Sequence, residues 1–144
     1  MRGVAAVEMA VLLVPLVLMT FGAVEFGRAI QTFNTLAKAT RDAARHLSQQ
    51  PPGEATVQAQ ARCLAVHGDA DCAGAPLSPG LTVAQVDVCD AVTCVATHAR
   101  QPTAAGAVDL VSVTIRGYTW GSVLDLVVPD LGLRPISVTM RAGR

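Results

Sequence analysis

The stretch that decides the fold is "MRGVAAVEMAVLLVPLVLMTFGAVEF", residues 1–26. Between Val4 and Val24 the only charged residue is Glu8. A helix over this run rises about 31 Å at 1.5 Å per residue, which matches the roughly 30 Å hydrocarbon core of a bilayer. An ionised carboxylate in that core is costly, so Glu8 lies near one edge or has a partner of opposite charge. The stretch predicts a single membrane span over residues 4–27.

Two other interpretations of the apolar run fit the sequence less well. A removable secretory signal needs a basic start, a shorter apolar run and a cleavage site of small residues, whereas "EFGRAIQTFN" follows here. A helix that is apolar on every side can also be buried in a large core, but the remaining chain is too small to surround one. A membrane anchor fits best, and Pro15 within it favours a kink.

Length and charge limit what the rest of the chain can be. The sequence has 144 residues, with 11 basic and 11 acidic side chains. This balance gives no sign of a nucleic-acid or acidic-lipid partner. The part outside the membrane is near the lower end of what folds alone, and its few aromatic side chains predict a modest core.

Four cysteines follow the apolar run: Cys63, Cys72, Cys89 and Cys94. An even number in a small domain beyond a membrane segment indicates two disulfides in an oxidising compartment. Sequential pairing is the simplest of three connectivities, and the sequence does not decide among them. The alternative is a zinc site, but zinc ribbons use CxxC pairs and the spacings here are longer. We expect disulfides and no metal.

The orientation of the span is indicated by two conflicting signals. Arg2 stands alone before the span, while Arg28, Lys38, Arg41 and Arg45 follow it. The positive-inside rule, taken alone, places the C-terminal part in the cytoplasm. The cysteines indicate export, and we give them more weight because the basic residues also form the polar face of a helix.

The helix is expected to continue beyond the membrane over residues 28–50. Apolar and small side chains recur at helical spacing and predict a packed stripe: Ile30, Phe33, Leu36, Ala37, Thr40 and Ala44. Glu25 and Arg28, three residues apart, predict a local ion pair near the membrane surface. Pro51-Pro52-Gly53 ends the helix, and a second helix is expected from Glu54 to His67, with Gly68 as its stop.

After this helix the hydrophobic period changes to that of strands. "LTVAQVDVC" (81–89) and "VTCVATHA" (92–99) suggest a hairpin through Asp90-Ala91, and Asp69–Asp71 suggests a turn. Alternation in "AVDLVSVTIRGYTW" (107–120) and "PISVTMRA" (135–142) predicts two half-buried strands, with Tyr118 and Trp120 at the core edge. The segment between them (121–134) is expected to be irregular with one helical turn. The pattern predicts an α+β fold: a long N-terminal helix on a small, mostly antiparallel sheet, with residues 54–144 as a disulfide-bearing domain.

The segment "RGVAAVEMAVLLVPLVLMTFGAVEFGRAIQTFNTLAKATRDAAR" resembles the N-terminal signature of TadE-like proteins. These are minor pilins or pseudopilins of the tight-adherence (Tad/Flp) type IV pilus system of bacteria. The shared pattern is a Gly, a short apolar stretch, a Glu, an apolar span with Pro, then E-F-G-R and an N-T-L helix. The closing "ISVTMRA" is more loosely similar to the end of the family.

The resemblance implies a maturation step and a set of partners. A membrane prepilin peptidase is expected to cut between Gly3 and Val4, with residues 1–3 as a short leader and Glu8 as the fifth mature residue. The new amine on Val4 then neutralises the Glu8 carboxylate of a neighbouring subunit. Other pilins and Tad assembly proteins are the implied partners. The implied location is the inner membrane, with the N-terminus cytoplasmic and the C-terminal domain periplasmic, or incorporated into an extracellular pilus.

No catalytic motif is found. His46, His67 and His98 have no ligand partner at a metal-binding spacing, and Cys89 and Cys94 are too far apart for a C-x-x-C redox pair. We therefore expect no enzyme activity and no cofactor. The rival interpretation is an uncleaved membrane-anchored periplasmic binding or adhesive domain outside any pilus, and a thiol oxidoreductase is a more distant third.

Overall fold

The structure is a computed structural model that describes residues 2–104, 106–122 and 130–143. The helices are α1 (Arg2–Ser48), α2 (Ala55–His67), the 3₁₀ helix η1 (Val83–Gln85) and α3 (Val95–His98). The strands are β1 (Val86–Cys89), β2 (Gln101–Thr103), β3 (Gly106–Val108), β4 (Leu110–Ile115), β5 (Thr119–Trp120), β6 (Leu131–Gly132) and β7 (Ile136–Arg141). The α+β class and the long N-terminal helix predicted from the sequence are confirmed.

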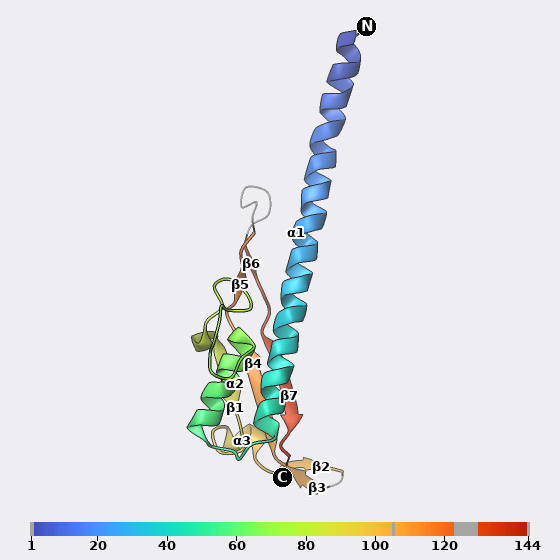
Figure 1. Ribbon diagram of the computed structural model, residues 1–144. Coiled ribbons are helices and arrows are strands. Elements are labelled where there is room, and N and C mark those ends of the chain that lie inside the picture. Colours follow the sequence, from blue (N-terminus) through green and yellow to red (C-terminus); the bar gives the residue numbers. More distant parts are fainter. Residues whose placement is uncertain (1, 105, 123–129, 144) are drawn as a thin grey trace.

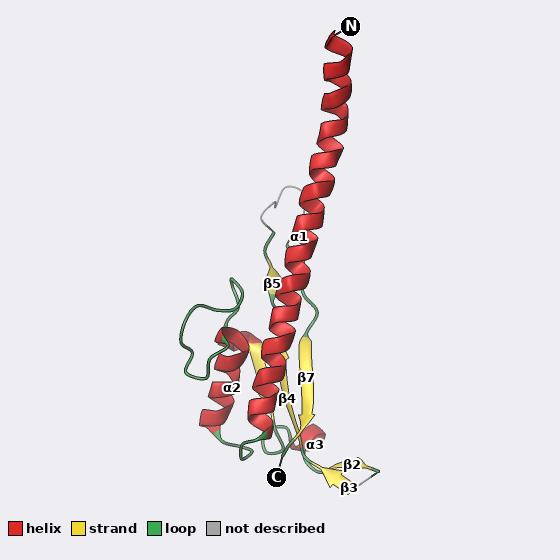
Figure 2. Ribbon diagram, turned by 45° about the vertical axis from the view of Figure 1, so that its right-hand side comes forward, coloured by secondary structure: helices red, strands yellow, loops and turns green. Residues whose placement is uncertain are grey.

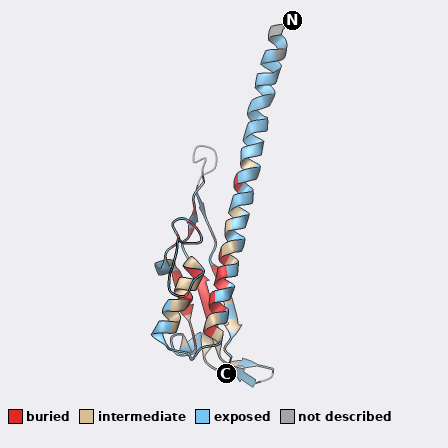
Figure 3. Cartoon of the chain, in the orientation of Figure 1, coloured by how far each residue is buried: buried red, intermediate tan, exposed pale blue. Residues whose placement is uncertain are grey.

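One long helix organises the molecule. α1 runs without interruption through Pro15, and its first half projects far beyond the rest of the chain (Figure 1). Its second half packs against α2 and a small sheet, which together form the head. Burial is concentrated in this lower part (Figure 3). The helix ends at Ser48, two residues before the expected limit, and Gly143, near the C-terminus, donates its N–H to the Ser48 carbonyl.

The packed face of α1 differs from the predicted stripe. Leu36, Thr40 and Ala44 are buried as expected, but Ile30 and Phe33 are exposed. Ile30 and Phe33 lie off the face of α1 that the head covers, on which Glu25 and Leu36 are buried and Ala29 is partly buried, so their side chains stay open.

Small residues let the two long helices approach closely. Ala43 and Ala44 of α1 and Ala61 and Ala65 of α2 are all fully buried in one cluster. Alanine has no side chain beyond Cβ, so the helix backbones come near each other without leaving a void. α2 ends at Gly68, whose φ of 73° is the left-handed conformation that favours glycine after a helix.

The main sheet has three antiparallel strands in the order β1-β4-β7 (Figure 2). Val111, Val113 and Ile115 of β4 face the helices and are buried, as the alternation predicts. Ser112 and Thr114 on the other face are also largely buried, since Ser112 contacts His98 and Thr114 contacts Ser137. β4 is therefore a central strand that is covered on both sides.

The predicted hairpin between residues 81–89 and 92–99 is wrong. β1 forms, but its partner is β4, and residues 95–98 are the short helix α3. The Asp90 side chain accepts the N–H groups of Val92 and Thr93, which folds the chain into a helical turn directly after β1. A short apolar run with β-branched residues does not distinguish the two outcomes by periodicity.

The expected irregular connection over 121–134 is only partly described. Residues 123–129 lie outside the described residues, and the expected helical turn is not found in the described part of the connection. Leu131–Gly132 forms the short strand β6 instead and pairs with β5 (Thr119–Trp120). This two-stranded ribbon reaches along α1 beyond the main sheet (Figure 1).

Candidate functional site: the exposed helix and its junction with the head

The first half of α1 is a continuous apolar surface. Every large hydrophobic side chain described between Val4 and Val24 is exposed, and Met19 reaches 77%. The helix from Ala6 onward is long and apolar enough to cross a membrane, and none of its most apolar window is buried in the protein. Such a surface is stable only when lipid or another apolar helix covers it, which suggests membrane anchoring.

Glu8 is the one charged residue on this surface. Its side chain is exposed and, within the described part of the chain, makes no hydrogen bond or ion pair. The other polar side chain between Val4 and Val24 is satisfied internally, since the Thr20 hydroxyl donates to the Leu16 carbonyl at 2.8 Å. Val4 lies one helical turn before Glu8 on the same helix. No side chain in the described part of the chain therefore neutralises the Glu8 carboxylate.

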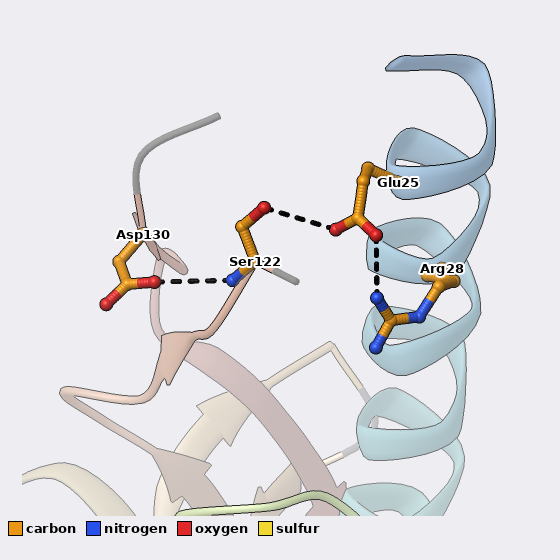
Figure 4. A network of polar contacts seen from close by, with 4 residues as sticks. All are labelled: Glu25, Arg28, Ser122 and Asp130. Atoms are coloured by element: carbon orange, nitrogen blue, oxygen red, sulfur yellow. Dashed lines mark hydrogen bonds and ion pairs between the residues drawn. The ribbon is translucent and has the colours of Figure 1, made fainter. Parts of the chain in front are cut away.

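A second acid, Glu25, marks the point where the apolar run ends. It is only 5% exposed and pairs with Arg28 at 2.7 Å, which confirms the predicted local ion pair. The other carboxylate oxygen accepts a hydrogen bond from the Ser122 hydroxyl at 3.3 Å. Figure 4 shows this network, in which the N–H of Ser122 also donates to Asp130. Glu25 thus ties α1 to the end of the β5–β6 ribbon.

Arg28 has a second neighbour on the ribbon. Its guanidinium carbon lies 5.8 Å from the centre of the Trp120 ring, within the range of a cation–π contact. Trp120 and Tyr118 are both buried, in agreement with their predicted place at the core edge. The sequence spacing of Glu25 and Arg28 predicts their pairing, but nothing in it points to Ser122 or Trp120.

The cysteines form two disulfides, Cys63–Cys72 and Cys89–Cys94. The first fastens α2 to the loop that follows it. The second closes the turn between β1 and α3. This is the sequential pairing.

Asp90, inside the second disulfide loop, is the most connected polar residue of the head. It is 1% exposed, and its carboxylate accepts hydrogen bonds from Gly53, Gln58, Val92 and Thr93. Burial alone would raise the pKa of Asp90, but the backbone N–H groups of Thr93 and Gly53 and the Gln58 amide outweigh it, so the pKa lies well below its ordinary value. Asp90 joins the loop after α1, the helix α2 and the disulfide loop.

His98 lies beside the second disulfide. One of its ring nitrogens and the sulfurs of Cys89 and Cys94 lie within 4.8 Å of one another. Both sulfurs are committed to the disulfide, and the two ring nitrogens of His98 contact the hydroxyls of Ser112 and Thr97 at 2.7 Å. The group is a packed contact between α3 and β4. The predicted turn at Asp69 is also present, with its carboxylate accepting the N–H of Asp71.

Together these features define a class: an α+β protein with a long N-terminal helix, a candidate membrane span in its exposed half, and a small disulfide-bonded head. Residues 3–45 match the family model described as TadE-like protein. The resemblance to TadE-like proteins is thus confirmed for the N-terminal third of the chain, and it suggests involvement with the Tad pilus system. No match to a curated protein or to a solved structure is found.

Proposed function

We propose that the protein is a minor pilin or pseudopilin that takes part in assembly of a Tad/Flp-type pilus. The observation that carries this proposal is Glu8, an acid without a partner in the described chain, on a helix face that the head leaves fully open. A simple anchor gains nothing from a carboxylate in its apolar run, because the charge raises the cost of insertion. A helix that docks against other subunits gains a fixed register from it.

The proposed mechanism begins with cleavage between Gly3 and Val4 by a prepilin peptidase. Cleavage creates a positively charged amine on Val4, about 6 Å along the helix axis from Glu8 at 1.5 Å per residue. A neighbouring subunit displaced by about one turn brings its own amine to this carboxylate. Two opposite charges that are buried together relieve each other's desolvation, and removal of one partner costs on the order of 3–5 kcal/mol.

The role that we propose is structural rather than enzymatic. Both pairs of cysteines are joined as disulfides, and the carboxylate of Asp90 is occupied by hydrogen bonds that hold the head together. The partners are other pilins, Tad assembly proteins and the peptidase. The disulfides support an inner-membrane location with the head in the periplasm, from which the subunit can enter a pilus.

The test compares Glu8→Ala with two matched variants in native membranes. Glu8→Ala is expected to insert normally but to lose association with other pilus components by about 100-fold or more, the equivalent of 3–5 kcal/mol. Glu8→Asp keeps the charge and is expected to retain part of the association. Thr20→Val removes a polar group that is satisfied within its own helix and is expected to behave as wild type. Normal co-purification of Glu8→Ala with the pilus machinery would contradict the mechanism.

N-terminal sequencing of the same preparations decides between the proposal and its rival. A mature chain that starts at Val4 supports the pilin role. A chain that still carries Gly3 supports an uncleaved anchor that presents a binding or adhesive domain. One feature of the head favours that second role: a groove of about 590 Å³ between the loop that follows α1 and the ends of β3 and β7.

A further inference from the structure

We propose that the β5–β6 ribbon lies against the phospholipid headgroups, so that the head touches the membrane surface next to the span. The part of the ribbon concerned is its described end, Trp120–Ser122 and Asp130–Leu131. This inference rests on membrane anchoring by α1 and is independent of N-terminal processing.

The depth of the ribbon follows from its attachment to α1. The apolar run ends at Val24, and about 31 Å of helix before it fill the hydrocarbon core. Glu25 and Arg28 then lie about 1.5 and 6 Å beyond the core edge. The headgroup layer on each side is roughly 5–7 Å thick, so both residues lie within it. Ser122, bonded to Glu25, and Trp120, under Arg28, are held at the same level.

The side chains at this level suit a phospholipid headgroup. Arg28 remains 46% exposed although it is paired with Glu25, so its guanidinium has donors left for a phosphate oxygen. Leu131, which pairs with Trp120 across the ribbon, is 44% exposed, and Phe26 next to Glu25 is exposed as well. Arginine with exposed apolar neighbours suits the boundary between headgroups and hydrocarbon. Arg28 and Phe26 of α1 and Leu131 of the ribbon make this contact, and the buried Trp120 lies directly beneath Arg28.

The contact has a fixed geometry because the acid beneath it is buried. Glu25 is 5% exposed and bonded on both carboxylate oxygens, one to Arg28 and one to Ser122. Separation of the ribbon from α1 would leave this carboxylate without Ser122 next to the hydrocarbon. The Glu25 network therefore holds the head at one depth and one angle to the membrane.

Trp120 makes this inference directly measurable, since it is the only tryptophan of the chain. The full-length protein is placed in nanodiscs of phosphatidylcholine and phosphatidylglycerol that carry one copy each. One set contains a lipid with a nitroxide on its headgroup, and the other contains a lipid with bromines deep in its acyl chains. We expect the headgroup nitroxide to remove most of the Trp120 emission and the deep bromines to leave it nearly unchanged.

Two apolar-to-acid variants identify the surface. Leu131→Glu places an acid on the ribbon and is expected to lose most of the quenching by the headgroup nitroxide. Val95→Glu changes another exposed apolar residue, 61% exposed, on α3 at the opposite end of the head (Figure 1), and is expected to behave as wild type. Unchanged quenching in Leu131→Glu would overturn the proposal, as would stronger quenching by the deep bromines or none by either lipid.

The same samples also test whether a second copy of the chain, rather than lipid, covers this surface. Changes in Trp120 emission that appear only in discs with several copies would assign the ribbon to a second chain and would also overturn the proposal. Intact-mass measurement on these samples reports whether Gly3 is retained. The quenching data therefore test the headgroup contact, and the intact mass tests N-terminal processing, so either proposal can fail without the other.

Discussion

Replacement of Asp90 by asparagine tests the polar junction at the base of the head. One carboxylate oxygen accepts the N–H groups of Val92 and Thr93, and the other accepts the N–H of Gly53 and the amide of Gln58. Asparagine has the same shape but presents an NH2 group on one side. If that group faces α2, the Gln58 amide can rotate to accept from it, but the N–H of Gly53 cannot.

The expected cost follows from this one mismatch. A donor that loses its acceptor in a covered position costs about 1–3 kcal/mol, so Asp90→Asn should lower the free energy of unfolding by that amount. Asp87→Asn is the matched control, because Asp87 pairs with Arg116 on the exposed surface at 2.8 Å. An exposed pair contributes little, and this variant should stay within about 0.5 kcal/mol of wild type.

The dependence of stability on pH provides a second, independent test of the role of Asp90. The pKa of Asp90 is lower in the folded chain than in the unfolded one, so the folded state binds fewer protons there. This contribution is present in full above the unfolded pKa of about 3.9 and is lost as the pH falls below it. The difference in stability between wild type and Asp90→Asn should therefore shrink below about pH 4.

The assay is urea unfolding of the full-length protein in detergent micelles with both disulfides intact, followed by Trp120 emission. The control variant Asp87→Asn is measured in parallel. A change in Asp90→Asn no larger than that of the control, or a difference that stays constant down to about pH 2.5, would refute the assigned role of the carboxylate.

Two further predictions concern the head. The first is that removal of either disulfide, by Cys63→Ser with Cys72→Ser or by the same change at Cys89 and Cys94, lowers the free energy of unfolding in urea by about 2–3 kcal/mol, because each bridge closes a short loop. An unchanged free energy of unfolding would mean that the bridge does not constrain the unfolded chain. The second is that Ala61→Leu lowers the free energy of unfolding by about 1–3 kcal/mol, because the larger side chain overpacks the contact between α1 and α2. Ala23→Leu, on the open face of α1, is the control and should leave stability unchanged. Equal melting temperatures for the two variants would contradict the close helix packing.

The two long helices, α1 and α2, and the strands β4 and β7 could be predicted because local signals determine them. Pro51-Pro52-Gly53 and Gly68 bracket α2, and the alternation in 110–115 and 136–141 corresponds to β4 and β7. The turn after β1 was missed although its bonds from Asp90 to Val92 and Thr93 are local, because an aspartate at this position suits a hairpin turn and a helical turn equally, and the short apolar run after it does not separate the two. The β5–β6 ribbon was missed for a related reason: two-residue strands carry no periodicity.

The candidate site divides in the same way. The exposed run, Glu8 and the Glu25–Arg28 pair are visible in the sequence because they lie within one helix. The link from Glu25 to Ser122 spans 97 positions and has no sequence signal of its own. It arises from the path of the ribbon, which follows only once the sheet is placed against α1.

Because α1 is unbroken, the head and the apolar run are rigidly connected through one helix. Leu36, Ala43 and Leu47 hold the head to the same helix that carries the apolar run, so no joint absorbs a movement between them. Withdrawal of one residue from the bilayer lifts the head by about 1.5 Å, and a change of one residue in docking register turns it by about 100°. A rotation or displacement that a neighbouring subunit imposes on the apolar end of α1 is thus transmitted along the helix to the head.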